Sequence, residues 1–280
     1  MSQSISTEIA HKAPMFRRTF IAAIGGAVIT TACAKSAKLT DSGWARSGDN
    51  TNPINHDAWD KILMTYGHVA KDGVNRIDYK GLKANAAADL NAYIKALESV
   101  KISDYPRSEQ FAYWVNLYNA TTVQVIVKRY PIKSIRDIGI VGQGPWNDKL
   151  LVVEGKSLSL DNIEHGILRP IWKDARIHFA VNCASIGCPN LALKAYRAAT
   201  LEPMLEDAAQ MYVNHPRGFA QIDGKIIASN IFEWYQSDWG NEAGVLSFAR
   251  KYATGQTAAF LKDATSIGGY DYNWSLNDIV

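Results

Sequence analysis

Hydrophobic side chains recur at helical spacing through the first half of the chain. Residues 56–70 and 86–100 repeat apolar positions three and four apart, which predicts two helices that each bury one face. Residues 106–131 are apolar nearly all round, begin with Ser108 as a predicted N-cap, and end with two basic residues and a proline. We therefore expect this third helix to be central and buried.

Strand patterns follow in the second half. Residues 149–160 and 219–229 each place a glycine-containing turn between apolar runs, and Asp223-Gly224 is a strong signal for a two-residue hairpin. Residues 176–182 are a third apolar run that predicts a strand. Hairpins without repeated strand-helix-strand units indicate the α+β class, with several helices packed on a small, mainly antiparallel sheet.

An export signal is predicted for residues 1–33. Arg17 and Arg18 precede an apolar run that is too short to span a bilayer, and small residues follow it. The residues before Cys33 resemble a lipobox, but residues 32–34 equally fit a small-x-small cleavage site. Both interpretations place the mature protein in the cell envelope, in the periplasm or attached to a membrane by a lipid on Cys33.

The remaining chain is expected to form a linker and one domain. Residues 34–55 are polar and aperiodic, as in a flexible linker, and residues 56–280 show no repeat and no second linker. The net charge is +3, with 30 basic and 27 acidic residues and no long basic run. This balance is not that of a nucleic-acid-binding protein, so no nucleic-acid partner is expected.

Several motifs between residue 56 and the end carry a family resemblance. They are FAYWVNLYNATTVQVI, YPIKSIRDI, GKSLSLDNIEHGILRP, RIHFAVNCASIGCPNL, AYRAATLEPMLEDAAQMYVN and YDYNWSLND. In this order they resemble the bacterial and plant family named domain of unknown function 547. That family is defined by sequence and not by a reaction, so the resemblance implies membership and no activity.

Two amides interrupt the predicted buried helix. Asn116 and Asn119 are spaced i, i+3 and share one face, so both are expected to be buried and to need hydrogen-bond partners. They either bind loop backbone or belong to a substrate site.

The motif around Glu164 and His165 is the second chemical candidate. Asp161 lies three residues before Glu164, which fits an acidic capping box at the start of a helix. His165 then falls in the first turns, with Arg169 at i+4, where the helix dipole favours a neutral imidazole that accepts a proton. A structural histidine is an equal alternative.

Cys183 is the third candidate, because it ends the predicted strand and begins a loop of small residues. In a strand His178 points to the opposite face from Cys183, so a base must come from elsewhere. The small residues let a substrate approach, and we expect them to leave backbone N–H groups free as an oxyanion site. Cys188 is separated from Cys183 by four residues and precedes a proline, which also fits a helix N-cap.

Three interpretations of the two cysteines remain open. They are a disulfide or a pair of inert buried thiols, one reactive thiol, and metal or redox chemistry. The spacing matches no familiar zinc pattern, so no metal and no cofactor is expected.

The function predicted from these residues is a cysteine hydrolase or acyl transferase with papain-like or transglutaminase-like logic. Cys183 is the expected nucleophile, His165 the base, and Glu164 or Asn119 the group that orients the imidazole. The substrate is unknown, with a peptide or amide as the class such chemistry attacks. The alternative is a non-catalytic envelope scaffold with a Cys183-Cys188 disulfide.

Overall fold

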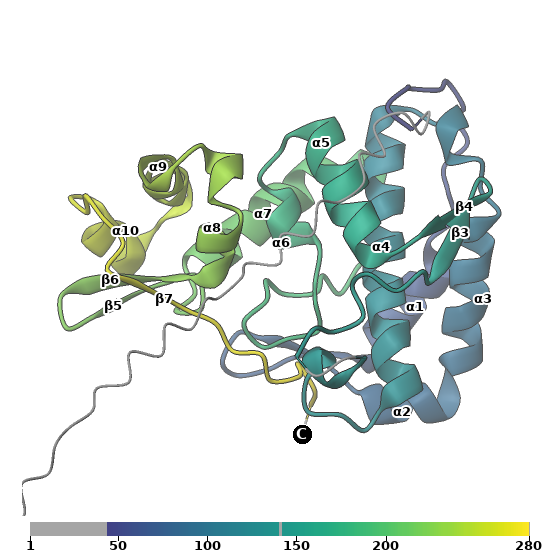
Figure 1. The fold of residues 1–280 in the computed structure, drawn as a ribbon, viewed down its shortest axis with the longest axis horizontal. Coiled ribbons are helices and arrows are strands. Elements are labelled where there is room, and N and C mark those ends of the chain that lie inside the picture. The colour runs from purple at the N-terminus through teal and green to yellow at the C-terminus, as the bar shows by residue number, and fades with distance from the viewer. Residues whose placement is uncertain (1–43, 140–141, 280) are drawn as a thin grey trace, which may run out of the picture. The chain divides into compact units, whose positions relative to one another are not determined.

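The computed structural model describes residues 44–139 and 142–279 (Figure 1). The helices in these residues are α1 Asp57–Tyr66, α2 Tyr79–Asn85, α3 Ala87–Glu98, α4 Arg107–Arg129, α5 Arg169–Trp172, α6 Ile177–Ala180, α7 Leu201–Val213, α8 Asn230–Trp234, α9 Glu242–Tyr252 and α10 Gly255–Leu261. A π-helical turn spans Asn162–Leu168, and single 3-10 turns span Ile102–Asp104, Ile135–Asp137, Ala198–Thr200 and Gln236–Trp239.

The strands form three small sheets. Two are antiparallel hairpins, β1 Gly67–Val69 with β2 Asn75–Ile77 and β3 Leu151–Val153 with β4 Lys156–Leu158. The third has the order β5-β6-β7, in which β5 Phe219–Ile222 pairs antiparallel and β7 Gly269–Asp271 pairs parallel with β6 Lys225–Ser229. These helices and mainly antiparallel sheets confirm the predicted α+β class.

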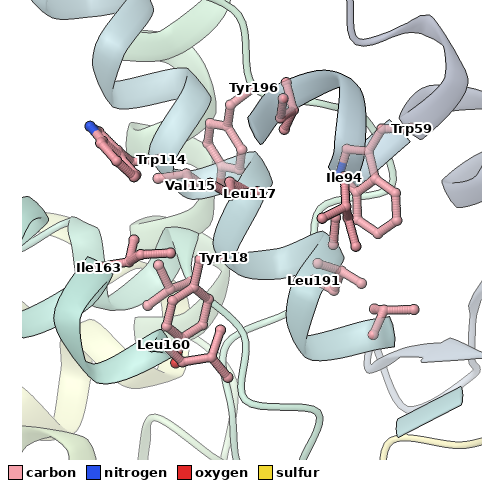
Figure 2. Close-up of a cluster of buried hydrophobic side chains, with 14 of the residues drawn as sticks. Trp59, Ile94, Trp114, Val115, Leu117, Tyr118, Leu160, Ile163, Leu191 and Tyr196 are labelled. Carbon is pink, nitrogen blue, oxygen red and sulfur yellow. The ribbon is translucent and has the colours of Figure 1, made fainter. Parts of the chain in front are cut away.

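The central helix is α4, which is buried from Glu109 to Val127. It contacts α2, α3 and the π-helical turn, and Figure 1 shows it beside α3. Figure 2 shows its Trp114, Leu117 and Tyr118 among apolar side chains that come from other segments of the chain. An apolar surface on all sides requires burial on all sides, so the prediction for this helix is confirmed.

A second apolar cluster lies around Phe179 and Phe232. It collects α7, α8 and α9 and the three-stranded sheet, with ring centroids of Phe219 and Phe232 4.6 Å apart. The predicted Asp223-Gly224 turn joins β5 and β6, and both residues have positive φ, 50° and 75°. This is the left-handed conformation that a two-residue hairpin turn demands.

Several predicted boundaries are corrected by the structure. The first helix ends at Tyr66, where Gly67 begins β1, and α4 has Pro106 and not Ser108 at its N-cap. Residues 176–182 contain the short helix α6 and no strand. All four of its residues are buried, and a short apolar run fits a buried helix as well as a buried strand.

The folded region also begins earlier than the sequence predicts. Trp44 and Ile54 lie in the expected linker, yet both are buried. Trp44 packs edge-on against Trp114 with 5.0 Å between ring centroids and donates a hydrogen bond from its indole to Glu154. Packing therefore includes residues from Trp44 onward, whereas the expected export signal lies outside the described residues.

Candidate functional site

Two asparagines of α4 hold the backbone of neighbouring loops. The Nδ2 of Asn119 donates to the Ala180 carbonyl at 2.9 Å, and its Oδ1 accepts from the Asn182 amide at 2.9 Å. Asn116 makes the same pair of bonds with the carbonyl and amide of Tyr196, at 2.8 and 2.9 Å. Each buried amide therefore satisfies one backbone donor and one acceptor.

The role of Asn119 follows from these bonds. The sequence predicts that Asn119 or Glu164 orients a catalytic imidazole. The Nδ2 and Oδ1 of Asn119 instead both bond backbone groups. Because Asn182 directly precedes Cys183, Asn119 fixes the chain at the point where the first thiol is presented. The geometry makes Asn119 a positioning residue for that thiol.

The loop of residues 181–190, which we call the cysteine loop, is bonded internally and to the C-terminal segment. Within the loop, the Ala184 N–H donates to Asn182 Oδ1 at 2.8 Å and the Cys188 N–H donates to the Ser185 carbonyl at 3.1 Å. The N–H groups of Ile186 and Gly187 donate to the C-terminal segment, to the carbonyls of Ser275 and Asn273, each at 2.8 Å. The expectation that the small residues of this loop leave their N–H groups free for an oxyanion is therefore wrong for Ala184 and Gly187. Cys188 also lies in a turn and not at a helix N-cap.

The two thiols lie side by side within this loop. Cys183 Sγ is 2.9 Å from Cys188 Sγ, and the Cys183 backbone N–H donates to Cys188 Sγ at 3.0 Å. Two hydroxyls complete the surroundings of Cys183, Ser185 Oγ at 3.2 Å and Tyr272 OH at 3.0 Å. Both cysteines are free thiols; Cys183 is partly exposed and Cys188 is buried.

The surroundings shift the pKa values of the two thiols in opposite directions. The hydrogen bond with Cys188 lowers the pKa of Cys183 against the opposing effect of burial, and the hydroxyls of Ser185 and Tyr272 add to the lowering. Burial, followed by the hydrogen bond with Cys183, holds the pKa of Cys188 well above its usual range. The thiolate therefore forms first on Cys183, the more exposed of the two residues.

Glu164 and His165 lie on the π-helical turn, a wider helix form that is common at functional sites. The predicted capping box of Asp161 and Glu164 is absent from this helix start. Ser159 and Asn162 cap the turn instead: the Asn162 amide donates to Ser159 Oγ at 3.1 Å, and the Ser159 amide donates to Asn162 Oδ1 at 3.2 Å. Glu164 is thereby released for contacts inside the protein.

Those contacts join Glu164 to a buried histidine. Tyr118 OH donates to Glu164 Oε2 at 3.1 Å, and His178 Nδ1 lies 3.8 Å from Glu164 Oε1. The other ring nitrogen of His178, Nε2, lies 2.7 Å from Asp238 Oδ2, and the imidazole stacks on Tyr235 with ring centroids 4.2 Å apart. Burial lowers the pKa of His178, although the bond with Asp238 opposes this.

Arg169 completes the polar cluster. It donates from Nε and NH2 to both oxygens of Asp238 at 2.7 Å each. Burial acts to raise the pKa of Asp238, but hydrogen bonds from His178 and Arg169 hold it well below its usual range. Asp238 is therefore a carboxylate that fixes the imidazole and the guanidinium together.

The structure brings some predicted site residues together and not others. His165 has Nε2 3.5 Å from Asp161 Oδ1 and Nδ1 2.9 Å from Arg169 Nη1. No hydrogen bond or ion pair of His165 among the described residues reaches Cys183. Cys188, burial, Ser185 and Tyr272 have the larger effects on the pKa of Cys183, and the negative charge of Glu164 acts with burial to raise it.

Sequence reasoning missed three residues of this site. Tyr272, in the quoted closing motif YDYNW, bonds Cys183 from far along the chain. Asp238 lies between the aromatic residues Tyr235 and Trp239, and no motif in the sequence marks it as a site residue. His178 was assigned to a strand face pointing away, and its helical backbone turns it toward Glu164.

Two further findings limit the chemistry of the described residues. Within residues 44–139 and 142–279, no group of three or more His, Cys, Asp or Glu side chains is arranged to hold a metal ion. Over the same ranges, no helix has the length and apolar character needed to cross a membrane.

Comparison with known proteins identifies the domain. Residues 102–213 match the sequence model of a family described as protein of unknown function, DUF547. The chain contains a DUF547 domain. The matched segment runs from the 3-10 turn before α4 to the end of α7. It therefore includes Asn116 and Asn119, the π-helical turn and the cysteine loop of the DUF547 domain. No curated protein and no solved structure matches the chain.

Proposed function

We propose that this DUF547 protein carries out thiol–disulfide exchange in the cell envelope, with Cys183 as the attacking thiolate and Cys188 as the resolving thiol. The observation that carries this proposal is the pair of sulfurs 2.9 Å apart, of which the partly exposed one is the more acidic. The attacking sulfur of a dithiol pair needs access and thiolate character, and the second needs proximity to it.

The reaction consists of two balanced exchanges. The Cys183 thiolate attacks one sulfur of a substrate disulfide, so that a mixed disulfide forms and the other substrate sulfur leaves as a thiolate. Cys188 then loses its proton and attacks Cys183 Sγ, which releases the second substrate thiol. The substrate gains two electrons and two protons, and the domain ends with a Cys183–Cys188 disulfide.

A single-turnover experiment tests this sequence. The full chain, with Cys33 replaced by alanine so that only the paired thiols react, is reduced and mixed with oxidised 2-mercaptoethanol. We expect an internal disulfide in the parent, a trapped mixed disulfide on Cys183 in Cys188→Ser, and no adduct at neutral pH in Cys183→Ser. A Cys188→Ser variant that turns over like the parent contradicts the resolving role.

The hydroxyl of Tyr272 provides a second test of the same site. Tyr272→Phe removes a donor to the Cys183 thiolate and keeps the ring, so the pH profile of Cys183 alkylation by iodoacetamide should move upward. Tyr270→Phe is the matched control, because the Tyr270 hydroxyl bonds Gln236 and not a thiol. Equal profiles for Tyr272→Phe and the parent contradict thiolate stabilisation by this hydroxyl.

Cysteine-dependent acyl transfer is the second candidate. It is supported by the His178 imidazole, which is held by Asp238 beside Glu164 in the manner of a base and its orienting carboxylate. It lacks a hydrogen bond between an imidazole and Cys183 among the described contacts, and four loop N–H groups are already used. Under this mechanism Cys188→Ser keeps full turnover and the parent thiols are not oxidised.

Location in the cell envelope is part of the proposal. It is supported by Arg17, Arg18 and the apolar run that follows, and by the persistence of disulfides in oxidising compartments. Protein from its native cells is expected to begin at Cys33 with lipid or at Lys35 without it. If its two loop cysteines are quantitatively bridged and do not exchange with added disulfides, the scaffold alternative replaces the enzyme.

A further inference from the structure

A cluster of aromatic rings adjoins the thiol pair. Tyr272 lies 4.7 Å from Trp274 and 4.9 Å from Trp234 between ring centroids, and the two tryptophans stack with an interplanar angle of 29° and 5.6 Å between centroids. We call these three residues the aromatic platform. It joins α8, which ends at Trp234, to the segment after β7.

The platform is open to solvent at one end and bonded to the nucleophile at the other. Trp234 is 40% exposed, and Tyr272 and Trp274 are half-buried. The Tyr272 hydroxyl lies 3.0 Å from Cys183 Sγ and 2.8 Å from Ser185 Oγ. A substrate atom in contact with Cys183 Sγ therefore lies beside Tyr272.

The other large exposed apolar side chains of the described residues lack this connection. They are the single aliphatic residues Met64, Val69, Val152, Met211, Ile222 and Ile279. None of them has a recorded contact with Cys183. Large exposed aromatic surface is common at binding sites, because a rigid ring buries much apolar area with little loss of conformational freedom.

The covalent chemistry restricts what covers the platform. The ring spacings place Trp234 and Trp274 within about 10 Å of the thiol, and extended chain advances about 3.3 Å per residue. Side chains within about three residues of an attacked cysteine therefore reach these rings, whereas a small disulfide without attached chain has no such side chain to offer. Resting on the proposed thiol exchange, we propose that the platform of Trp234, Tyr272 and Trp274 binds an aromatic or apolar side chain adjacent to the cysteine of a polypeptide disulfide.

Two synthetic peptides test this site. Each carries a disulfide between two cysteines, and they differ only in Phe or Ser at the residue after the first cysteine. The Cys33→Ala chain is expected to react about three- to ten-fold faster with the Phe peptide, the factor that one aromatic contact provides. Trp234→Ala should remove this preference, Trp234→Phe should restore most of it, and Met64→Ala, which trims an exposed side chain on α1, should keep it.

Oxidised 2-mercaptoethanol separates the two proposals. Trp234→Ala is expected to lose far less reactivity toward it than toward the Phe peptide, because this small disulfide carries no side chain for the platform to bind. Equal rates of the parent with both peptides, or an equal loss with peptide and small disulfide in Trp234→Ala, overturns the platform and leaves thiol exchange standing. Failure of the parent to react with any disulfide through Cys183 overturns the exchange itself. The peptide comparison uses the parent chain, so it decides the question even if Trp234→Ala does not fold.

Discussion

The buried histidine at the start of α1 makes folding stability depend on pH. His56 is fully buried, and its Nδ1 is 2.7 Å from the Tyr93 hydroxyl, while its Nε2 has no hydrogen-bond partner in the described structure. Burial lowers the pKa of His56 from 6.5 to about 4, and the nearby Arg197 cation adds to the effect. The folded protein therefore keeps this imidazole neutral in a range where the unfolded chain protonates it.

The sign and size of the effect follow from proton linkage. Between pH 6.5 and 4 the unfolded chain binds the extra proton, so the free energy of unfolding falls as the pH is lowered. At about 1.36 kcal/mol per pKa unit, the His56 contribution to stability declines by about 2 kcal/mol at pH 5 and about 3 kcal/mol at pH 4. Burial also lowers the pKa of His178 and His215, so these groups act in the same direction.

Urea unfolding at pH 7 and pH 5 measures this contribution. His56→Gln keeps a hydrogen-bonding group for Tyr93 but removes the titration, so its loss of stability between the two pH values should be smaller than that of the parent by about 2 kcal/mol. His68→Gln, at an exposed histidine, is the matched substitution control. The reasoning is refuted if parent and His56→Gln lose the same free energy over this range.

Two further substitutions test how the cysteine loop is held. Asn119→Ala leaves the Ala180 carbonyl and the Asn182 amide without the partners that Asn119 supplies. This should lower the free energy of unfolding by about 2 kcal/mol or more in urea titrations. A change below about 0.5 kcal/mol would show that other groups replace these bonds. Gly187→Ala places a Cβ 2.8 Å from the Asn273 backbone nitrogen. We therefore expect the free energy of unfolding to fall by at least about 1 kcal/mol in the same titration, and the internal disulfide to form more slowly. Unchanged values for both would contradict the tight packing of this turn.

Two different parts of the chain hold the cysteine loop in place. The cysteine loop is fixed by α4 through Asn119 and by the C-terminal segment through backbone bonds to residues 273–277. That C-terminal segment and the adjoining Tyr272 lie beyond the residues matched by the DUF547 sequence model, yet the Tyr272 hydroxyl contacts Cys183. Substitution of Tyr272 alone is therefore expected to alter reactivity while the backbone bonds that hold the loop remain.

Local sequence pattern was sufficient for the elements whose signal is periodic. The stripes of α1 and α3, the apolar surface of α4 and the Asp223-Gly224 hairpin were all predicted, because burial of one face, burial of all faces and left-handed backbone each demand particular residues at fixed spacing. The pairing of Asn116 and Asn119 on one buried face was also readable from their i, i+3 spacing.

Tertiary structure decided the features that depend on distant partners. The run containing His178 was predicted as a strand, because four buried residues carry no period that separates a strand from a helix, and the resulting orientation of His178 was wrong. Whether Glu164 caps its own helix or faces His178 depends on Ser159 and Asn162 taking the capping role. Tyr272 meets Cys183 across 89 positions of sequence, and no local pattern encodes a contact made only when the chain closes on itself.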